Sequence, residues 1–200
     1  MKRSGTPVAE AQLQWMRGMH AFLIGRFKDA IVLLDGAARA FAERCPGRVW
    51  EQAQAELFAA WAVSHVGDVK EFESRLAELE RVARWHDDRY TATQAGAGNS
   101  VLVPLAADDP TAARQRIATA MEGWSTEGFH IQHVLALQGA VEIDLYAGDN
   151  ASAWERYTSA WPELERSLLL RIQHTKVFSL DGRARAAIAA GSREALDDAE

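Results

Sequence analysis

The stretch Gly25-Arg-Phe-Lys-Asp-Ala30 joins two stripes of apolar residues at helical spacing, and similar loops return four times along the chain. Measured from Gly25, they recur at Gly67, Asp108, Gly148 and Gly191, at intervals of 42, 41, 40 and 43 residues. A near-constant period in this range is typical of helical-hairpin repeats, in which one unit cannot bury its apolar face alone and stacks on its neighbours. The pattern predicts an architecture and points to no reaction.

The composition fits an ordered, helical chain of 200 residues, because 48% are hydrophobic, 25% are charged and only five are proline. The net charge of −6 argues against a nucleic-acid partner, which requires clustered Lys and Arg. A single cysteine, Cys45, excludes an internal disulfide and suits a reducing compartment. Neither a secretory signal nor an apolar run of about 18 residues is present. We therefore expect a cytoplasmic protein without a membrane span.

Each unit is predicted to consist of helix A, a tight turn, helix B and a polar connection. In the first unit Ala11, Trp15 and Phe22 form one helical stripe, and Ala30 and Leu34 begin the next. The fold class that follows is all-α: a right-handed α-solenoid of about four helical hairpins plus a partial fifth. This single repeat domain covers residues 1–200, with units at about residues 8–45, 47–86, 88–126, 129–161 and 165–200.

The third unit contains the weakest predicted helix. Gly96 and Gly98 lie inside its helix A, and each glycine costs about 1 kcal/mol relative to alanine in a helix interior. We expect a kink or short break over about residues 94–99, either a hinge facing a ligand or a distortion held by neighbouring helices. Helix B resumes at Pro110, a residue suited to the first helical position, with Asp109 as its N-cap.

Trp161-Pro162 is predicted to end helix B of the fourth unit, because proline disrupts a helix interior. A long helix is expected from about residue 165 to residue 190, followed by a turn at Gly191. Two helical turns of helix B then remain before Glu200. An incomplete last hairpin suggests that the chain belongs to a longer protein.

Small residues are expected where helices cross closely, and large ones between the layers. The predicted crossing residues are Gly18, Ala30, Ala60, Ala113 and Ala153, and the predicted filling residues are Trp15, Trp61, Trp124 and Trp154.

Titratable residues form no recognisable catalytic set. His130 and His133 share a helix face, but a metal needs at least one further ligand. Glu142 and Asp144 lie two residues apart, so they point to different sides of their helix and do not form an acid–base pair. We expect a non-catalytic chain without cofactor or metal.

The repeats resemble tetratricopeptide units. The Gly-x-Phe/Tyr-x-x-Ala turn matches at Gly25, Phe27 and Ala30, and more loosely over residues 148–153. The units here are longer than the 34 residues usual in that family. The resemblance implies a concave surface lined by the first helix of each hairpin.

A narrower resemblance covers mainly the second half of the chain. The segments 128–133, 142–149 and 166–171, together with Trp124 and Trp154, are similar to the C-terminal helical-repeat extension of large bacterial serine/threonine protein kinases. In those proteins a kinase domain precedes the repeats. The Gly-rich loop, the His-Arg-Asp loop and the Asp-Phe-Gly motif of a kinase are missing from these residues.

The function expected from this reasoning is a sensory or scaffolding module that binds a protein or peptide, with a kinase domain on the same polypeptide. An alternative is the effector-binding repeat region of a bacterial transcription activator with a distant DNA-binding domain, or a groove for a small inducer. The repeat frame places five candidate residues in a peptide-binding groove: Gln54, His65, Gln138, Glu142 and Tyr146.

Overall fold

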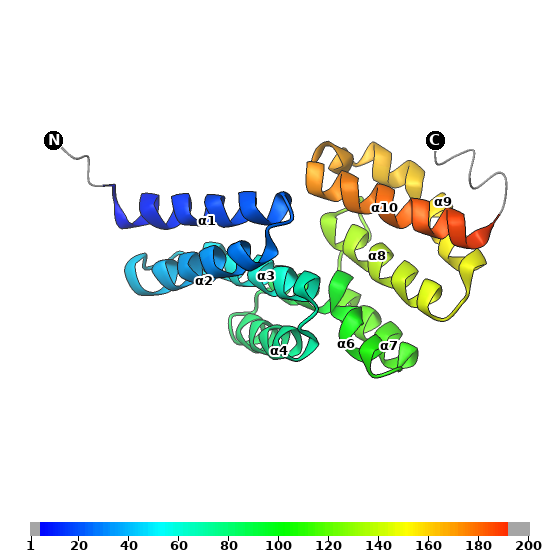
Figure 1. The fold of residues 1–200 in the computed structure, drawn as a ribbon, viewed down its shortest axis with the longest axis horizontal. Helices are drawn as coiled ribbons and strands as arrows, with labels where there is room; N and C mark the ends of the chain where they lie inside the picture. Colours follow the sequence, from blue (N-terminus) through cyan, green and yellow to red (C-terminus); the bar gives the residue numbers. More distant parts are fainter. Residues whose placement is uncertain (1–4, 192–200) are drawn as a thin grey trace. The chain divides into compact units, whose positions relative to one another are not determined.

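The computed structural model describes residues 5–191, and every regular element in that range is helical. Ten α-helices and two short 3-10 helices follow one another along these residues, without a strand (Figure 1). The expected all-α class is therefore confirmed. The chain divides into two compact units, residues 1–92 and 93–200, each of which is described by itself.

The first unit contains four helices of similar length. They are α1 (Pro7–Leu23), α2 (Phe27–Arg44), α3 (Val49–Val66) and α4 (Val69–Trp85). Each packs against the next along the chain, and α1 also contacts α3. These bounds agree with the helix A and helix B segments predicted for the first two repeats.

The second unit is less regular, and the dividing point between the units falls within α5. Its elements are α5 (Arg89–Gly96), η1 (Gly98–Val101), α6 (Leu102–Ala106), α7 (Pro110–Met121), α8 (Ile131–Tyr146), α9 (Asn150–Arg166), η2 (Leu169–Arg171) and α10 (Gln173–Ala190). Helix α8 packs against α7, α9 and α10, and α9 also packs against α10.

The five residues that define the repeat period share one backbone conformation. Gly25, Gly67, Asp108, Gly148 and Gly191 have φ values of 77°, 88°, 58°, 76° and 63°. This left-handed region favours glycine and tolerates aspartate, which explains why the period is visible in the sequence. A Cβ atom would meet no neighbour at the four glycines, so backbone conformation rather than space selects them.

An aspartate follows three of these turn residues and caps the next helix. The carboxylates of Asp68, Asp109 and Asp149 accept hydrogen bonds from backbone N–H groups three residues further on. Such N-caps satisfy amide groups that have no partner within the helix, and each contributes about 1 kcal/mol. The predicted cap at Asp109, with Pro110 as the first helical residue, is confirmed.

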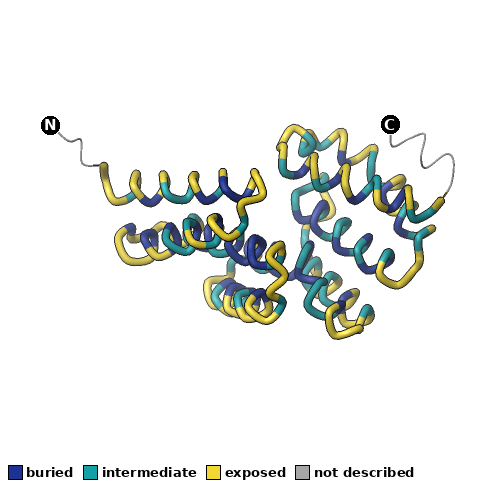
Figure 2. Tube along the Cα trace, in the orientation of Figure 1, coloured by how far each residue is buried: buried dark blue, intermediate teal, exposed yellow. Residues whose placement is uncertain are grey.

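Small side chains lie where the helices approach most closely. Ala30, Ala60, Ala113 and Ala153 are fully buried, and Gly18 of α1 packs directly on Leu34 of α2. Buried residues follow the inner side of each helix and exposed residues the outer side (Figure 2). The expected close approach is confirmed at Gly18, and the four alanines are buried.

The tryptophans agree less closely with expectation. Trp61 is buried, whereas Trp15 and Trp154 are half-buried. Trp124 does not belong to α7, because that helix ends at Met121; its half-buried indole donates instead to His130 Nδ1 at 3.2 Å. The short segment after α7 is held by this side-chain contact.

The predicted interruption of the third helix A is confirmed. Helix α5 ends at Gly96, Ala97 has an extended backbone, and Gly98 has a φ of 57° at the start of η1. A Cβ atom on Gly96 would lie 2.7 Å from the Ala120 Cβ, so close packing accompanies the break.

The predicted end of helix B at Pro162 is wrong, because α9 continues to Arg166. Proline removes one backbone hydrogen bond, but the following turn is held by other contacts. Leu164 is fully buried, and the Trp161 indole donates to Glu165 at 2.9 Å. Burial of an apolar anchor in the last turn therefore outweighs the local preference of proline.

The predicted long helix from residue 165 is also wrong, since α10 begins only at Gln173. The Ser167 hydroxyl donates to the Leu164 carbonyl and accepts from the Leu169 amide, which competes with the helical pattern. Leu168 then takes a φ of 64°, and this ends the helix. The helix B expected between Gly191 and Glu200 lies outside the described residues.

Candidate functional site

The two candidate groove residues of the first unit lie on one stripe of α3. Gln54 and His65 are eleven residues apart, or three helical turns. Gln54 is only 4% exposed and therefore offers little surface to a ligand. His65 is exposed, and its ring stacks on Phe27 of α2 with centroids 4.4 Å apart.

The same stripe of α3 carries an exposed residue that the sequence reasoning missed. Trp50 lies four residues before Gln54 and is 50% exposed. Its ring meets that of Trp15 on α1 edge to face, with centroids 6.0 Å apart. The helical spacing from Gln54 was a signal that could have identified Trp50.

Aromatic contacts join the C-terminal half of α1 to α3. We define the aromatic face by Trp15 and Phe22 of α1 and by Trp50, Phe58 and His65 of α3. Phe22 contacts Phe58 and His65, with centroid distances of 5.5 Å and 5.8 Å. The two ends of the aromatic face are open to solvent, because Trp50 and His65 are exposed. Its middle is closed, because Phe22 is buried.

The aromatic face is uncharged at neutral pH. Burial of the ring against its aromatic neighbours lowers the pKa of His65 below its ordinary value of 6.5, although part of the side chain remains exposed. A neutral imidazole both donates and accepts a hydrogen bond. The face therefore combines apolar rings with a polar group at one end.

The three candidate residues of the second unit share one face of α8. Gln138, Glu142 and Tyr146 follow one another at i, i+4 and i+8, so the structure brings them together as expected from the repeat frame. Two of them already have partners. Glu142 accepts from Arg185 of α10, and the Tyr146 hydroxyl donates to Asp108 at 2.6 Å. The hydrogen bond to Asp108 raises the pKa of Tyr146.

Glu142 and Asp144 have separate partners, which agrees with the prediction that they point to different sides of their helix. Asp144 is 1% exposed and accepts from Arg114 of α7 at 2.7 Å and from Arg156 of α9. The carboxylate therefore ties three consecutive helices together. Sequence reasoning missed this cluster because its members lie 30 and 12 residues from Asp144.

The histidine pair caps a helix. The His130 amide donates to His133 Nδ1 at 2.9 Å at the start of α8, and His130 Nδ1 accepts from Trp124. Burial lowers the pKa of His133, and the neighbouring His130 adds to this effect. Within residues 5–191, His, Cys, Asp and Glu form no group of three or more that could hold a metal.

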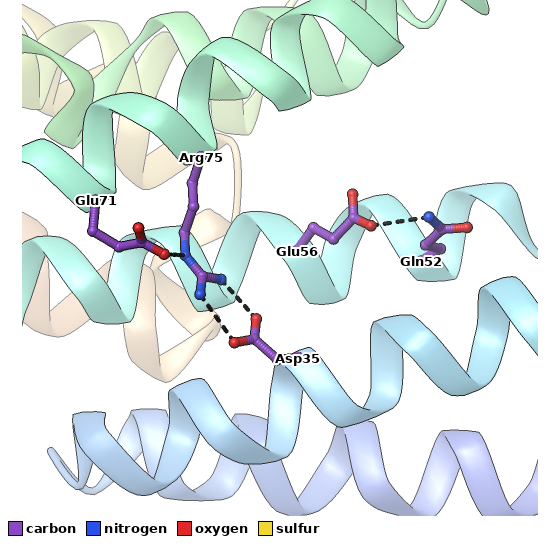
Figure 3. A network of polar contacts seen from close by, with 5 residues as sticks. All are labelled: Asp35, Gln52, Glu56, Glu71 and Arg75. Carbon is purple, nitrogen blue, oxygen red and sulfur yellow. Dashed lines mark hydrogen bonds and ion pairs between the residues drawn. The ribbon is translucent and has the colours of Figure 1, made fainter.

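A second polar cluster joins α2 and α4 of the first unit (Figure 3). The Arg75 guanidinium of α4 makes two hydrogen bonds to the Asp35 carboxylate of α2, at 2.6 Å and 3.0 Å. Its Nε atom donates to Glu71, one helical turn earlier in α4, at 2.8 Å. Paired, bidentate geometry of this kind is among the stronger arrangements for an ion pair.

Glu56 lies on α3 beside this cluster, and Gln52 donates to its carboxylate at 2.9 Å. Burial raises the pKa of the Glu56 carboxyl, although the hydrogen bond from Gln52 opposes the rise. Nearby Glu78 and Asp35 raise the pKa further, because a second negative charge disfavours ionisation. Glu56 thus lowers the stability of the unit at neutral pH.

Replacing Glu56 by glutamine is expected to raise the thermal unfolding midpoint at about pH 7, with a smaller gain towards about pH 4. A carboxyl whose pKa is raised on folding binds more protons in the folded state. Stability therefore falls as the pH rises from the ordinary pKa of 4.5 through the raised value. The amide avoids this loss and can still accept from Gln52. Circular dichroism melts across that pH range measure the effect.

The matched control is Glu73→Gln, which removes an exposed carboxylate from α4 of the same unit. Its midpoint should change little at any of these pH values. A Glu56→Gln variant that is less stable than the wild type at neutral pH would contradict the assignment.

Comparison of the chain with protein-family models, with curated proteins and with solved structures gives no match. Among the helices of residues 5–191, none combines the length and the hydropathy needed to cross a bilayer.

Proposed function

We propose that this chain is a non-catalytic protein-interaction module of tetratricopeptide-like hairpins, stacked as a right-handed α-solenoid, that binds a peptide or protein segment. The observation that carries the proposal is the aromatic face of α1 and α3, where Trp50 is half exposed and His65 is exposed at the other end. Aromatic side chains are enriched at the energetic centres of protein interfaces, because they bury a large area with few rotatable bonds.

The repeated turns support the same proposal. All five turn residues adopt the left-handed conformation at a nearly constant period, and consecutive helices pack on each other from α1 to α4 and from α6 to α10. Hairpins that stack directly on one another present the first helix of each hairpin on one surface. On this reasoning α1 and α3 form a binding surface on the first unit, and α8 of the second unit carries a separate candidate surface with Gln138, Glu142 and Tyr146.

The physiological setting that we propose is the cytoplasmic sensory or scaffolding region of a multidomain bacterial serine/threonine protein kinase. It rests on the resemblance of residues 128–133 and 142–149 to such extensions. The complete open reading frame tests this setting. A kinase domain encoded with these repeats would support it, and a helix-turn-helix domain would instead assign the repeats to a transcription activator.

Replacing Trp50 by alanine is expected to weaken peptide binding by about tenfold or more, because exposed tryptophans that enter an interface commonly contribute at least 1.4 kcal/mol. Ligands are first selected from a displayed peptide library against the wild-type chain. Fluorescence anisotropy then measures the affinity of each selected peptide for the wild type and for the variant.

The control is Trp85→Ala, which removes an 83% exposed tryptophan at the end of α4. Its affinity for the selected peptides should remain within about twofold of the wild type. A library that yields no ligand, or equal loss of affinity in both variants, would overturn the proposal. A Gln138→Ala/Glu142→Ala variant examines the α8 face separately, and unchanged affinity would exclude that face.

A further inference from the structure

A shallow depression lies at the edge of the first unit formed by α1 and α2. Its volume is about 390 Å³, and its apolar lining includes Met16 of α1, Ile24 just after α1 and Leu33 of α2. It is separate from the aromatic face, whose exposed ends are Trp50 and His65 of α3.

An exposed apolar stripe continues the depression along α1. Leu13, Met16 and Ile24 are 53%, 51% and 53% exposed and lie close to one side of the helix. Eleven residues separate the first from the last, which corresponds to about 16 Å along the axis. The buried residues of α1, such as Gly18 and Phe22, pack inward, so the stripe is not used by the core of the unit.

The rim of the depression carries one arginine outside the ion pairs among the described residues of the first unit, although the chain as a whole has a net charge of −6. Arg17 is exposed beside the stripe, and His20, which lies one helical turn from both Met16 and Ile24, is an exposed polar residue within it. Arg26 is paired with Asp29, whereas Arg17 forms no ion pair with any residue in the described part of the chain. An apolar surface flanked by an uncompensated positive charge complements a ligand that is apolar and acidic.

We propose that this edge of α1 and α2 is a docking site for an acidic amphipathic helix of a partner protein. The length of the stripe matches about three turns of a helix, whose apolar side chains would cover Leu13, Met16 and Ile24. Its glutamate or aspartate side chains would lie over Arg17. Recognition of an amphipathic helix by an apolar groove with a charged rim is a recurrent mode of peptide binding.

The charge of the edge decides between this occupant and a second copy of the chain. An isologous contact of α1 with itself would bring the Arg17 guanidinium of one copy towards that of the other. Like charges that face each other disfavour such a pair. The open form of the depression also suits a helix better than a small molecule, which binds best in an enclosed pocket.

The test uses the full chain and a labelled helical peptide of about 16 residues built from leucine and glutamate, with leucines at i, i+4, i+7 and i+11. Fluorescence anisotropy should detect saturable binding of this peptide and none of its lysine counterpart. Arg17→Glu should weaken binding by about tenfold or more, since it replaces an attraction by a repulsion. Met16→Glu should have an effect in the same direction.

Arg39→Glu is the matched control, because Arg39 is an exposed residue of α2 and the substitution changes the net charge equally. It should alter the affinity by less than about twofold. The proposal is overturned if the lysine peptide binds or if the acidic peptide does not bind. It is also overturned if Arg17→Glu and Arg39→Glu lose affinity for the acidic peptide equally. A dimer of the wild type in sedimentation analysis that dissociates in Arg17→Glu would also overturn the proposal, since a second copy would then cover this edge.

The proposal goes beyond the proposed function of the aromatic face and can fail independently of it. Peptides that bind the aromatic face lose affinity in Trp50→Ala, whereas the acidic helix loses affinity in Arg17→Glu. Each variant should leave the other interaction unchanged.

Discussion

Replacing Gly18 by valine is expected to lower the free energy of unfolding by about 3 kcal/mol. A Cβ atom at this position would lie 2.7 Å from Cγ and 2.8 Å from Cδ2 of Leu34, and 3.2 Å from its backbone amide. Leu34 is fully buried, so its side chain cannot move into solvent. The substitution must therefore separate α1 from α2. Urea unfolding followed by circular dichroism measures the change.

The control is Gly36→Ala in α2. A Cβ atom there meets only the terminal amide of Gln14, a flexible side chain that can move aside. Alanine is favoured over glycine in a helix interior by about 1 kcal/mol, so this variant should be as stable as the wild type or more stable. If Gly18→Val unfolds at the same urea concentration as Gly36→Ala, the close approach of α1 and α2 is incorrect.

Replacing both Arg114 and Arg156 by methionine is expected to destabilise the second unit by about 3 to 5 kcal/mol, the range found when a buried charge loses its partners. Asp144 is 1% exposed, and the two guanidinium groups are its ion-pair partners within residues 5–191. Each single variant should have a smaller effect, because the remaining arginine still compensates the carboxylate. Thermal unfolding of the two single variants and the double variant reveals this non-additivity.

Asp144→Asn in the background of the double variant provides a second measurement. An uncharged amide is less costly to bury than an isolated carboxylate, so this substitution should recover part of the lost stability. The exposed Arg81 of the first unit is the control, and Arg81→Met should leave the unfolding midpoint nearly unchanged. If the stability losses of the two single variants add up to that of the double variant, the two arginines do not compensate for each other. If Asp144→Asn recovers no stability, the charge of Asp144 is not the cause of the loss.

Most of the secondary structure could be predicted from the sequence. The tight turns at Gly25, Gly67 and Gly148, the cap at Asp109 and the break near Gly98 all agree with the structure. These features depend on contacts within about four residues, where backbone conformation and capping act. Pro162 is the exception, because burial of the nearby Leu164 outweighed a local signal.

The candidate site was predicted less completely. Helical spacing correctly placed Gln138, Glu142 and Tyr146 on one face of α8 and His65 on the surface of α3. It did not reveal that Gln54 is buried, nor that Trp50 is the exposed aromatic residue of the same stripe. Spacing defines which residues share a face, but only the neighbouring helices determine how much of that face is covered.

The sequence by itself determined that this protein is helical, where its hairpins turn and which residues share a helical face. Its information on these points is local, since a positive φ or an i, i+4 stripe involves only nearby residues. The tertiary structure alone decided which distant charges meet. Asp35 pairs with Arg75 forty residues away, and Asp144 receives two arginines from separate helices. Such pairs depend on the translation and rotation of one helix against another, and these follow from packing of the whole unit rather than from any short segment.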